Sequence, residues 1–215
     1  MVQNRYVWWM PKDPSQTPKT QRGRASRERL VEAAAQSVVD HGIHQMRLDE
    51  VLASAGSSKS QMYHYFTDRD GLVAAAVEYR CAEVLAGLAP AFEGIDSMRG
   101  LAAVLDVFAD QYAHQLAGCP IGTLASELTA GPEPAWRAVV EAFASWEAFL
   151  AQALTRIRGR GELKPDADPV TLATGLLATL EGGMFLSQVR RDPAPLRAAL
   201  TSALGYLASL HQRLD

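Results

Sequence analysis

Residues 48–66 read LDEVLASAGSSKSQMYHYF. Two short helical segments, at about 48–54 and 59–65, flank Gly56, whose tolerance of positive φ suits a tight turn between helices. Ser58 stands where it can cap the second segment, and the free N–H groups of that end also suit phosphate. This pattern is typical of a helix-turn-helix, whose second helix enters the major groove of DNA. An ordinary helix hairpin is the alternative. The side chains expected to face DNA are Lys59, Ser60, Gln61, Tyr63 and His64.

The rest of the chain also reads as helix, interrupted by clear breakers. Ser26 is a candidate N-cap for a first helix that Gly42 would end, and Asp68 is a candidate cap for a fourth helix. Later helices are expected at about 97–117, 120–130, 136–159, 168–190 and 193–212. No strand pattern is visible. The sequence therefore predicts an all-α fold of about nine helices, with a helix-turn-helix head and a helical body.

Composition places the chain among soluble proteins. It has 215 residues, of which 48% are hydrophobic, so a sizeable core can be buried. No apolar stretch reaches the roughly 18 residues that span a bilayer, and Pro11 cuts short the only apolar run near the N-terminus. Cys81 and Cys119 lie far apart without metal-ligand spacing, which suits a reducing compartment. We expect a cytoplasmic protein with no membrane partner.

Charge is distributed unevenly along the chain. The net charge is −3, which by itself does not indicate a nucleic-acid binder. Residues 1–80 hold 11 Lys and Arg against 9 Asp and Glu, whereas residues 81–215 hold 10 against 15. The basic excess thus lies at the end that carries the helix-turn-helix, as contact with phosphate requires. The asymmetry is mild and would not indicate DNA binding alone.

Three regions follow from these patterns. Residues 1–20 contain Pro11, Pro14 and Pro18 among polar residues and are expected to be a flexible leader or the product of an over-early start codon. An arm that packs on its own domain or touches DNA is the alternative. Residues 21–68 are expected to form the DNA-binding domain, and residues 69–215 the ligand-binding and dimerisation domain.

The stretch from Arg24 to Glu78 resembles the DNA-binding domain of TetR/AcrR-type repressors. The resemblance rests on Gly42, on the run AGSSKSQMYHYF at 55–66, and on the basic-acidic pair Arg69-Asp70 before an apolar helix. It covers about a quarter of the chain. Two departures stand out: Met46-Arg47 replaces the Thr that commonly caps the second helix, and Ser57 replaces a usual Val.

Roles for several residues are implied by this resemblance. Tyr63 and His64 would contact phosphate or a base edge, while Lys59, Ser60 and Gln61 would face the groove. Arg69 would donate to phosphate from the start of the fourth helix, and Arg47 could also reach phosphate. The predicted DNA-binding residues are Arg47, Ser58, Lys59, Ser60, Gln61, Tyr63, His64 and Arg69.

The body is rich in aromatic residues at helical spacing, most of which would simply fill a core. Within this architecture the body helices enclose a ligand cavity, and apolar pockets with a few polar groups bind small molecules. An apolar or aromatic-bearing effector is therefore expected. The predicted ligand-binding residues are Phe108, Tyr112, Glu127, Trp136, Phe143, Trp146 and Phe149. Cys119 stands near a helix start that could lower the pKa of its thiol, although a structural role is the simpler interpretation.

The last two helices are apolar on more than one face, which requires partners on two sides. A two-fold, four-helix interface between two copies is the interpretation that the resemblance also implies, and burial within one chain is the alternative. The predicted interface residues are Leu172, Leu176, Leu180, Met184, Leu200, Leu204 and Leu207.

These patterns predict a homodimeric DNA-binding regulator, most simply a repressor released from a double-stranded DNA operator by a small molecule. No nucleophile elbow, phosphate-binding loop or metal-ligand cluster is visible in the sequence, so no enzymatic activity and no cofactor are expected. A helical small-molecule-binding or catalytic protein with a relic DNA-binding head is the alternative from another class. Activation rather than repression depends on promoter geometry, which the chain does not encode.

Overall fold

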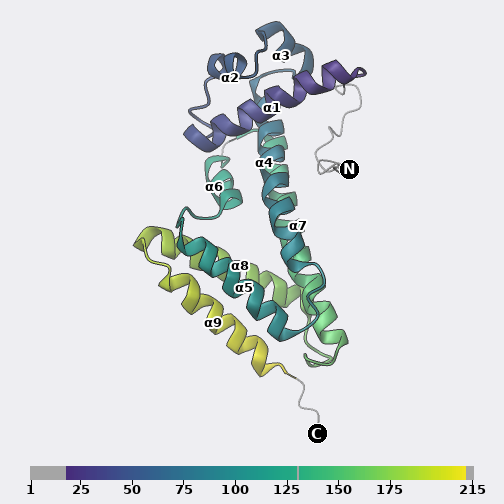
Figure 1. Cartoon of the computed structure of the whole chain (residues 1–215), viewed down its shortest axis with the longest axis vertical. Helices are drawn as coiled ribbons and strands as arrows, with labels where there is room; N and C mark the ends of the chain where they lie inside the picture. The colour runs from purple at the N-terminus through teal and green to yellow at the C-terminus, as the bar shows by residue number, and fades with distance from the viewer. Residues whose placement is uncertain (1–17, 130, 212–215) are drawn as a thin grey trace. The chain divides into compact units, whose positions relative to one another are not determined.

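The computed structural model of the protein describes residues 18–129 and 131–211. In these ranges the chain forms nine α-helices and no strand, which confirms the predicted all-α fold. Figure 1 labels them along the chain. Their bounds are α1 (Gln21–His41), α2 (Leu48–Ser54), α3 (Lys59–Tyr65), α4 (Arg69–Phe92), α5 (Met98–Ala113), α6 (Pro120–Glu127), α7 (Glu133–Gly159), α8 (Pro169–Arg190) and α9 (Ala194–Ser209).

The chain divides into two compact units. Unit 1 comprises residues 1–86 and 123–142, and unit 2 comprises residues 87–122 and 143–215. Helices α4, α6 and α7 each contribute residues to both units. The predicted domain boundary at residue 68 stays a prediction, and most of the predicted leader, residues 1–17, lies outside the described residues.

Helix α1 begins earlier than its predicted start near Ser26. It starts at Gln21 because Thr20 is extended and its hydroxyl accepts a hydrogen bond from the N–H of Gly23. Ser26 is instead buried within the helix. The predicted end is confirmed: Gly42 has φ of 81° and donates to the carbonyl of Val38, a conformation that an L side chain adopts only with strain.

Helices α2 and α3 have the bounds that the sequence predicts. Gly56 adopts φ of 58° in the turn between them. Ser58 then caps α3 with a reciprocal pair of hydrogen bonds: its hydroxyl accepts from the N–H of Gln61 at 3.2 Å, and the Gln61 side chain accepts from the N–H of Ser58 at 2.9 Å. This capping box fixes where α3 begins.

The core of unit 1 forms where the apolar faces of α1 to α4 meet. Leu30, Val31 and Ala34 of α1 are fully buried, as is Met62 of α3. The i, i+3, i+4 spacing of the α1 residues is what places them on one face. Burial of this small core holds the two short helices, which are too short to be stable alone.

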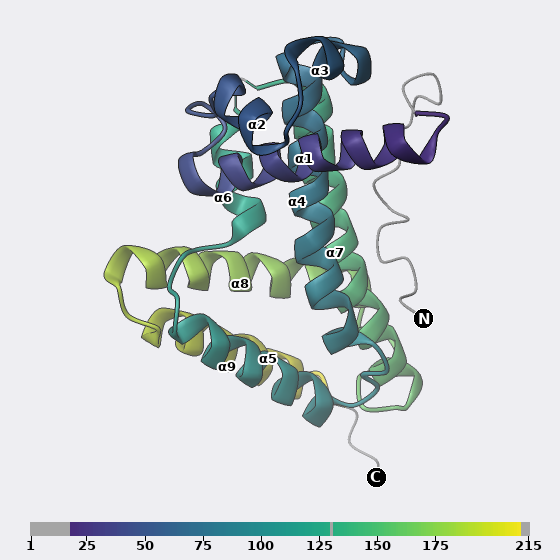
Figure 2. The same cartoon turned by 45° about the horizontal axis from the view of Figure 1, so that its top comes forward.

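In unit 2, α9 packs along α8 and also contacts α5 (Figures 1 and 2). Asp168 caps α8 by accepting from the N–H groups of Val170 and Thr171, with Pro169 at the first helical position as predicted. Helices α8 and α9 touch closely at Gly183, where an added Cβ would lie 3.0 Å from the Cα of Leu196. Beside this contact the buried Ser187 hydroxyl accepts from the N–H of Leu196 at 3.0 Å.

Most residues predicted for a dimer interface already pack within the chain, and their part in an interface stays a prediction. Five of the seven are already buried inside one chain, and the other two are half-buried. The buried ones are Leu176, Leu180, Met184, Leu200 and Leu207, and the half-buried ones are Leu172 and Leu204. Because α8 is apolar all round, a period of 3.6 residues does not tell which stripe faces the chain's own core. The exposed apolar side chains of these helices are Val170, Phe185, Leu186, Val189 and Tyr206.

Helix α8 is also long and apolar enough, by length and composition, to cross a membrane, contrary to the expectation that no segment is. Core helices of soluble proteins meet the same criterion. Leu176, Leu180 and Met184 pack inside unit 2, so one face of α8 serves a protein core.

The capping box gives a stability prediction. Ser58→Ala removes the hydroxyl that accepts from Gln61, and we expect it to lower the free energy of unfolding by about 1 kcal/mol. Urea denaturation followed by circular dichroism measures this value. Ser60→Ala, an exposed change inside the same helix, should leave the stability unchanged or slightly raised. Equal stability of Ser58→Ala and the wild type would contradict the role given to the cap.

Candidate nucleic-acid interface

Helix α3 presents two different faces. Met62 and Tyr65 are buried, and Phe66 after the helix is buried with them. Lys59, Ser60, Gln61 and His64 are exposed, and Tyr63 is 50% exposed. The buried face belongs to the small core of unit 1. The exposed face gathers five of the predicted DNA-binding residues on one short helix.

Four predicted DNA-binding residues already have partners within the chain: Ser58, Gln61, Arg47 and Arg69. The carbonyl of the Gln61 side chain is occupied by the capping box, as is the hydroxyl of Ser58. Arg47 stands at the N-cap of α2 without capping it, as its side chain offers no acceptor, and it pairs at 2.7 Å with Glu50. Both members of that pair are largely exposed, so it stabilises little and leaves Arg47 able to exchange partners.

The loop between α1 and α2 is held from two directions. The guanidinium of Arg69 donates to the carbonyls of Ile43 at 3.0 Å and Met46 at 3.3 Å. The carboxylate of Glu127, on α6, accepts from the N–H of Ile43 at 2.5 Å. All three hydrogen bonds involve a charged group and are partly buried, the kind that contributes most to stability. Sequence reasoning missed both roles, since each depends on a partner far along the chain.

Arg27 of α1 is a second residue that sequence reasoning missed. Its guanidinium lies over the ring of Phe66, 4.9 Å from the ring centre, and the side chain is buried. Burial lowers the pKa of Arg27, and the charges of Glu78 and Glu28 oppose that change. The cation thus serves the packing of α1 on the end of α3.

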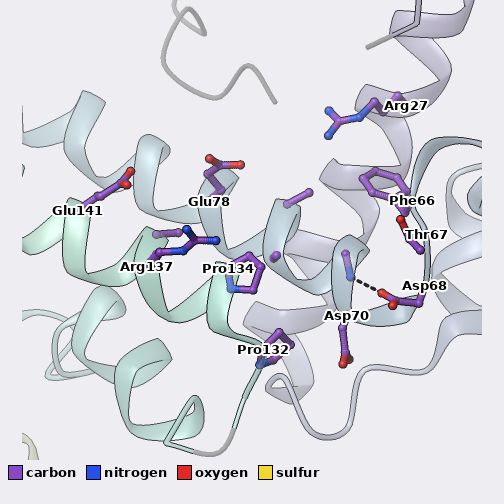
Figure 3. A pocket seen from close by; sticks show the side chains of 14 residues that line it. Arg27, Phe66, Thr67, Asp68, Asp70, Glu78, Pro132, Pro134, Arg137 and Glu141 are labelled. Carbon is purple, nitrogen blue, oxygen red and sulfur yellow. Dashed lines mark hydrogen bonds between the residues drawn. The ribbon is translucent and has the colours of Figure 1, made fainter. Parts of the chain in front are cut away.

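Arg27 also lines a groove of about 600 Å³ in unit 1. Figure 3 shows the groove, with Arg27 and Phe66 on one side and Arg137 and Glu141 on the other. Four carboxylates line it against two guanidinium groups: Asp68, Asp70, Glu78 and Glu141 against Arg27 and Arg137. The acidic excess repels phosphate, so this face of unit 1 is unsuited to DNA and the α3 face is the better candidate.

In unit 2, part of the predicted ligand set comes together. Phe108 of α5 and Trp146 of α7 lie in a tilted pair with ring centres 6.3 Å apart. Tyr112, one turn after Phe108, accepts from the N–H of Gly118 at 3.1 Å and donates to the carbonyl of Met184 at 2.8 Å. Phe143 and Phe149 are half-buried on the same α7 helix. These five residues belong to the unit 2 interior.

The other two residues of that set lie in unit 1. Glu127 holds the α1–α2 loop, and Trp136 is 39% exposed near the start of α7. Their contact with a ligand stays a prediction.

Next to Tyr112 stands a carboxyl group that the sequence analysis passed over. Glu181 is the only ionisable residue between Val170 and Val189. Burial raises its pKa, and a hydrogen bond with Cys119 opposes that shift. A lone charge in an apolar helix was the signal that could have found it.

Cys119 is not an activated thiol. Burial and the nearby charge of Glu181 raise its pKa to about 12, and its sulfur accepts from the N–H of Gly122 at 3.3 Å. The effect of burial therefore exceeds any lowering by the start of α6, in line with the structural interpretation of this residue. Among the described residues, no three His, Cys, Asp or Glu side chains are grouped to hold a metal ion.

Comparison with known proteins agrees with this architecture. Residues 30–76 match the family "Bacterial regulatory proteins, tetR family", and residues 97–203 match "Tetracyclin repressor-like, C-terminal domain". An HTH-type transcriptional regulator from Mycobacterium tuberculosis is 33% identical over 186 residues, which cover 79% of this chain and 88% of the relative. The transcriptional regulator AcuR from Cereibacter sphaeroides is 26% identical, covering 86% of this chain and 90% of the relative.

Solved structures show the same fold. The crystal structure of a TetR transcriptional regulator from Chloroflexus aurantiacus superposes with a TM-score of 0.72 at 26% identity, covering 89% of this chain and 98% of that one. The reduced form of NemR from E. coli gives a TM-score of 0.69 at 24% identity, covering 87% and 97%. With a helix-turn-helix in α2 and α3 and relatives matched over most of both chains, the protein belongs to the TetR family of bacterial transcriptional regulators.

Proposed function

We propose that this regulator is a repressor that a small molecule releases from its operator. The observation that carries the proposal is the exposed polar face of α3. The opposite face of α3 is buried, and the α1–α2 loop before the motif is held by Arg69 and Glu127. A rigidly held helix with Lys, Ser, Tyr and His outward suits the major groove. The alternative of a relic head gains no support from the family matches, because both the head and the body match regulators.

The predicted contacts divide into two classes. Lys59 and Arg47 suit phosphate, since a cation paired with phosphate supplies affinity that does not depend on sequence. Tyr63, His64 and Ser60 suit phosphate or base edges. Arg69 and Gln61 are weaker candidates than the sequence made them, because the groups they would offer to DNA already serve the loop and the cap.

Regulators of this family act as dimers on DNA operators. For this chain we propose a two-fold interface built from the exposed apolar side chains of α8 and α9, chiefly Phe185 and Val189 of α8 and Tyr206 of α9. They are 62%, 64% and 60% exposed, an unusual state for large apolar groups in a soluble chain. Two heads held by such an interface would read half-sites about 34–36 Å apart.

We further propose a cytoplasmic location, no enzymatic activity and an apolar or aromatic-bearing effector. The relatives are soluble bacterial regulators, which supports the first two points. The Phe108–Trp146 pair in the interior of unit 2 supports the third. The effector acts only through its different affinity for the DNA-binding and released states.

Selection of bound duplexes from a random pool tests the function directly. The full-length protein should enrich a near-palindromic sequence, and its affinity for that sequence should fall steeply with added salt. Enrichment of no sequence, with binding no tighter than to a scrambled duplex, would overturn the proposal.

The exposed face of α3 gives a binding prediction. Lys59→Ala should weaken binding to the selected operator and reduce the slope of log affinity against log salt by about one. Tyr63→Phe should weaken binding while keeping the fold, because only the hydroxyl is lost. Fluorescence anisotropy across a salt series measures both effects. Lys164→Ala in unit 2 is the matched control and should bind as the wild type does. Wild-type affinity and slope in both α3 variants would remove these residues from the interface.

The exposed face of α8 gives an assembly prediction. Phe185→Glu and Val189→Glu should each yield folded monomers with sharply reduced operator affinity, because each places a charge in an interface expected to be dry. Sedimentation velocity at micromolar concentration decides the oligomeric state. Val107→Glu, an exposed apolar residue of α5, is the control and should remain dimeric. Dimers that persist in both α8 variants would refute the proposed face.

A further inference from the structure

Two buried polar atoms in unit 2 have no hydrogen-bond partner among the described residues. One is the indole nitrogen Nε1 of Trp146, whose side chain is 2% exposed, and the other is Oε1 of Glu181. Buried polar groups in native proteins are nearly always paired, because an unpaired one loses its hydrogen bonds to water and gains none within the protein. The Trp146 nitrogen is a donor and the Glu181 oxygen is an acceptor. A molecule that pairs with both must therefore carry one acceptor and one donor.

Helix α5 connects the two atoms. Phe108 of α5 pairs with the Trp146 ring, and Tyr112 follows one turn later on the same helix. The Tyr112 hydroxyl donates to the carbonyl of Met184, three residues after Glu181 on α8. Burial raises the Tyr112 pKa, and the charge of Glu181 adds to that rise. The two unpaired atoms thus belong to side chains that lie beside residues one turn apart on α5, Trp146 beside Phe108 and Glu181 near Tyr112.

The start of α6 packs closely against the carboxyl group of Glu181. An added Cβ at Gly122 would lie 3.0 Å from Oε2 of Glu181 and 3.3 Å from the Cβ of Cys119, so only glycine lets the start of α6 come this close. Cys119 satisfies the carboxyl from that side. Oε1 is left without a donor in an apolar helix, where a leucine or a glutamine would fill the space at less cost.

We propose that unit 2 binds a small aromatic amine that also carries a hydrogen-bond acceptor. Its ring lies by Phe108 and Trp146, its acceptor takes the indole N–H of Trp146, and its ammonium group pairs with Oε1 of Glu181. The inference rests on the proposed function, since it names the chemistry of the effector of the same body.

Four para-substituted benzenes of closely similar size test the proposal by isothermal titration calorimetry on the full-length protein. 4-Acetylbenzylamine carries both groups, 4-ethylbenzylamine lacks the acceptor, 4-ethylacetophenone lacks the amine and 1,4-diethylbenzene lacks both. We expect the first to bind more tightly than either single-group compound by about tenfold or more. No binding of 4-acetylbenzylamine at millimolar concentration, or equal affinity for all four, would overturn the proposal.

Two variants assign each preference to its residue. Trp146→Phe keeps an aromatic ring but removes the N–H, and should abolish the preference for the acetyl group while keeping that for the amine. Glu181→Gln should do the reverse. Glu133→Gln, at an exposed residue of unit 1, is the matched control and should keep both preferences. Preferences that survive in the two unit 2 variants, or that vanish in the control, would contradict the assignment.

Two further readouts separate this inference from the proposed function. Without any probe, both variants should unfold at temperatures no lower than the wild type, because Trp146→Phe removes a buried unpaired N–H and Glu181→Gln removes a partly buried charge. A loss of stability in both would assign the two side chains to structure and overturn the inference. Operator release is measured separately by anisotropy. If the compounds bind selectively but do not release the operator, the binding site is supported and the proposed ligand-released repressor is contradicted. If the compounds release the operator without the expected selectivity, the proposed function is supported and the binding site is contradicted.

Discussion

Both backbone polar groups of Ile43 are hydrogen-bonded to charged side chains: its N–H donates to Glu127 and its carbonyl accepts from Arg69. Ile43 lies in the loop that joins the long α1 to the short α2, so these two hydrogen bonds fix where the helix-turn-helix starts. Helices of seven residues do not stand alone in water. The orientation of α3, and with it the placement of Lys59 and Tyr63, therefore depends on a loop that two charged side chains define.

Local signals predicted α2 and α3 well, because every element of that motif is encoded within a few residues. Gly56 supplies the turn, Ser58 and Gln61 supply the cap, and Met62, Tyr65 and Phe66 share the buried side. The start of α1 was placed too late, because Ser26 and Thr20 are both acceptable caps and only packing selects between them. The roles of Arg69 and Glu127 could not be foreseen, since their partners are set by tertiary structure and not by spacing.

The body was harder to predict for two physical reasons. An all-round apolar helix such as α8 gives no periodic signal, so the residues chosen for the interface between copies, such as Leu176 and Leu180, are those that the chain buries itself. Aromatic spacing did indicate the Phe108–Trp146 pair, but not the orphaned indole nitrogen. Glu181 was visible as a lone charge in an apolar segment. Only the structure shows its burial, its contact with Cys119 and its unpaired oxygen Oε1.

The hydrogen bond between Ile43 and Glu127 joins residues 84 positions apart, whereas the buried one between Ser187 and Leu196 spans only nine. Closing a longer loop costs more entropy, so the α8–α9 hairpin can form from its own sequence while the α1–α2 loop waits for a distant segment. During synthesis, α1 to α4 leave the ribosome well before α6 exists. The DNA-reading end of the chain is thus made first but completed late, and a nascent chain cut short before residue 127 carries a helix-turn-helix whose entry loop lacks one of its two anchors.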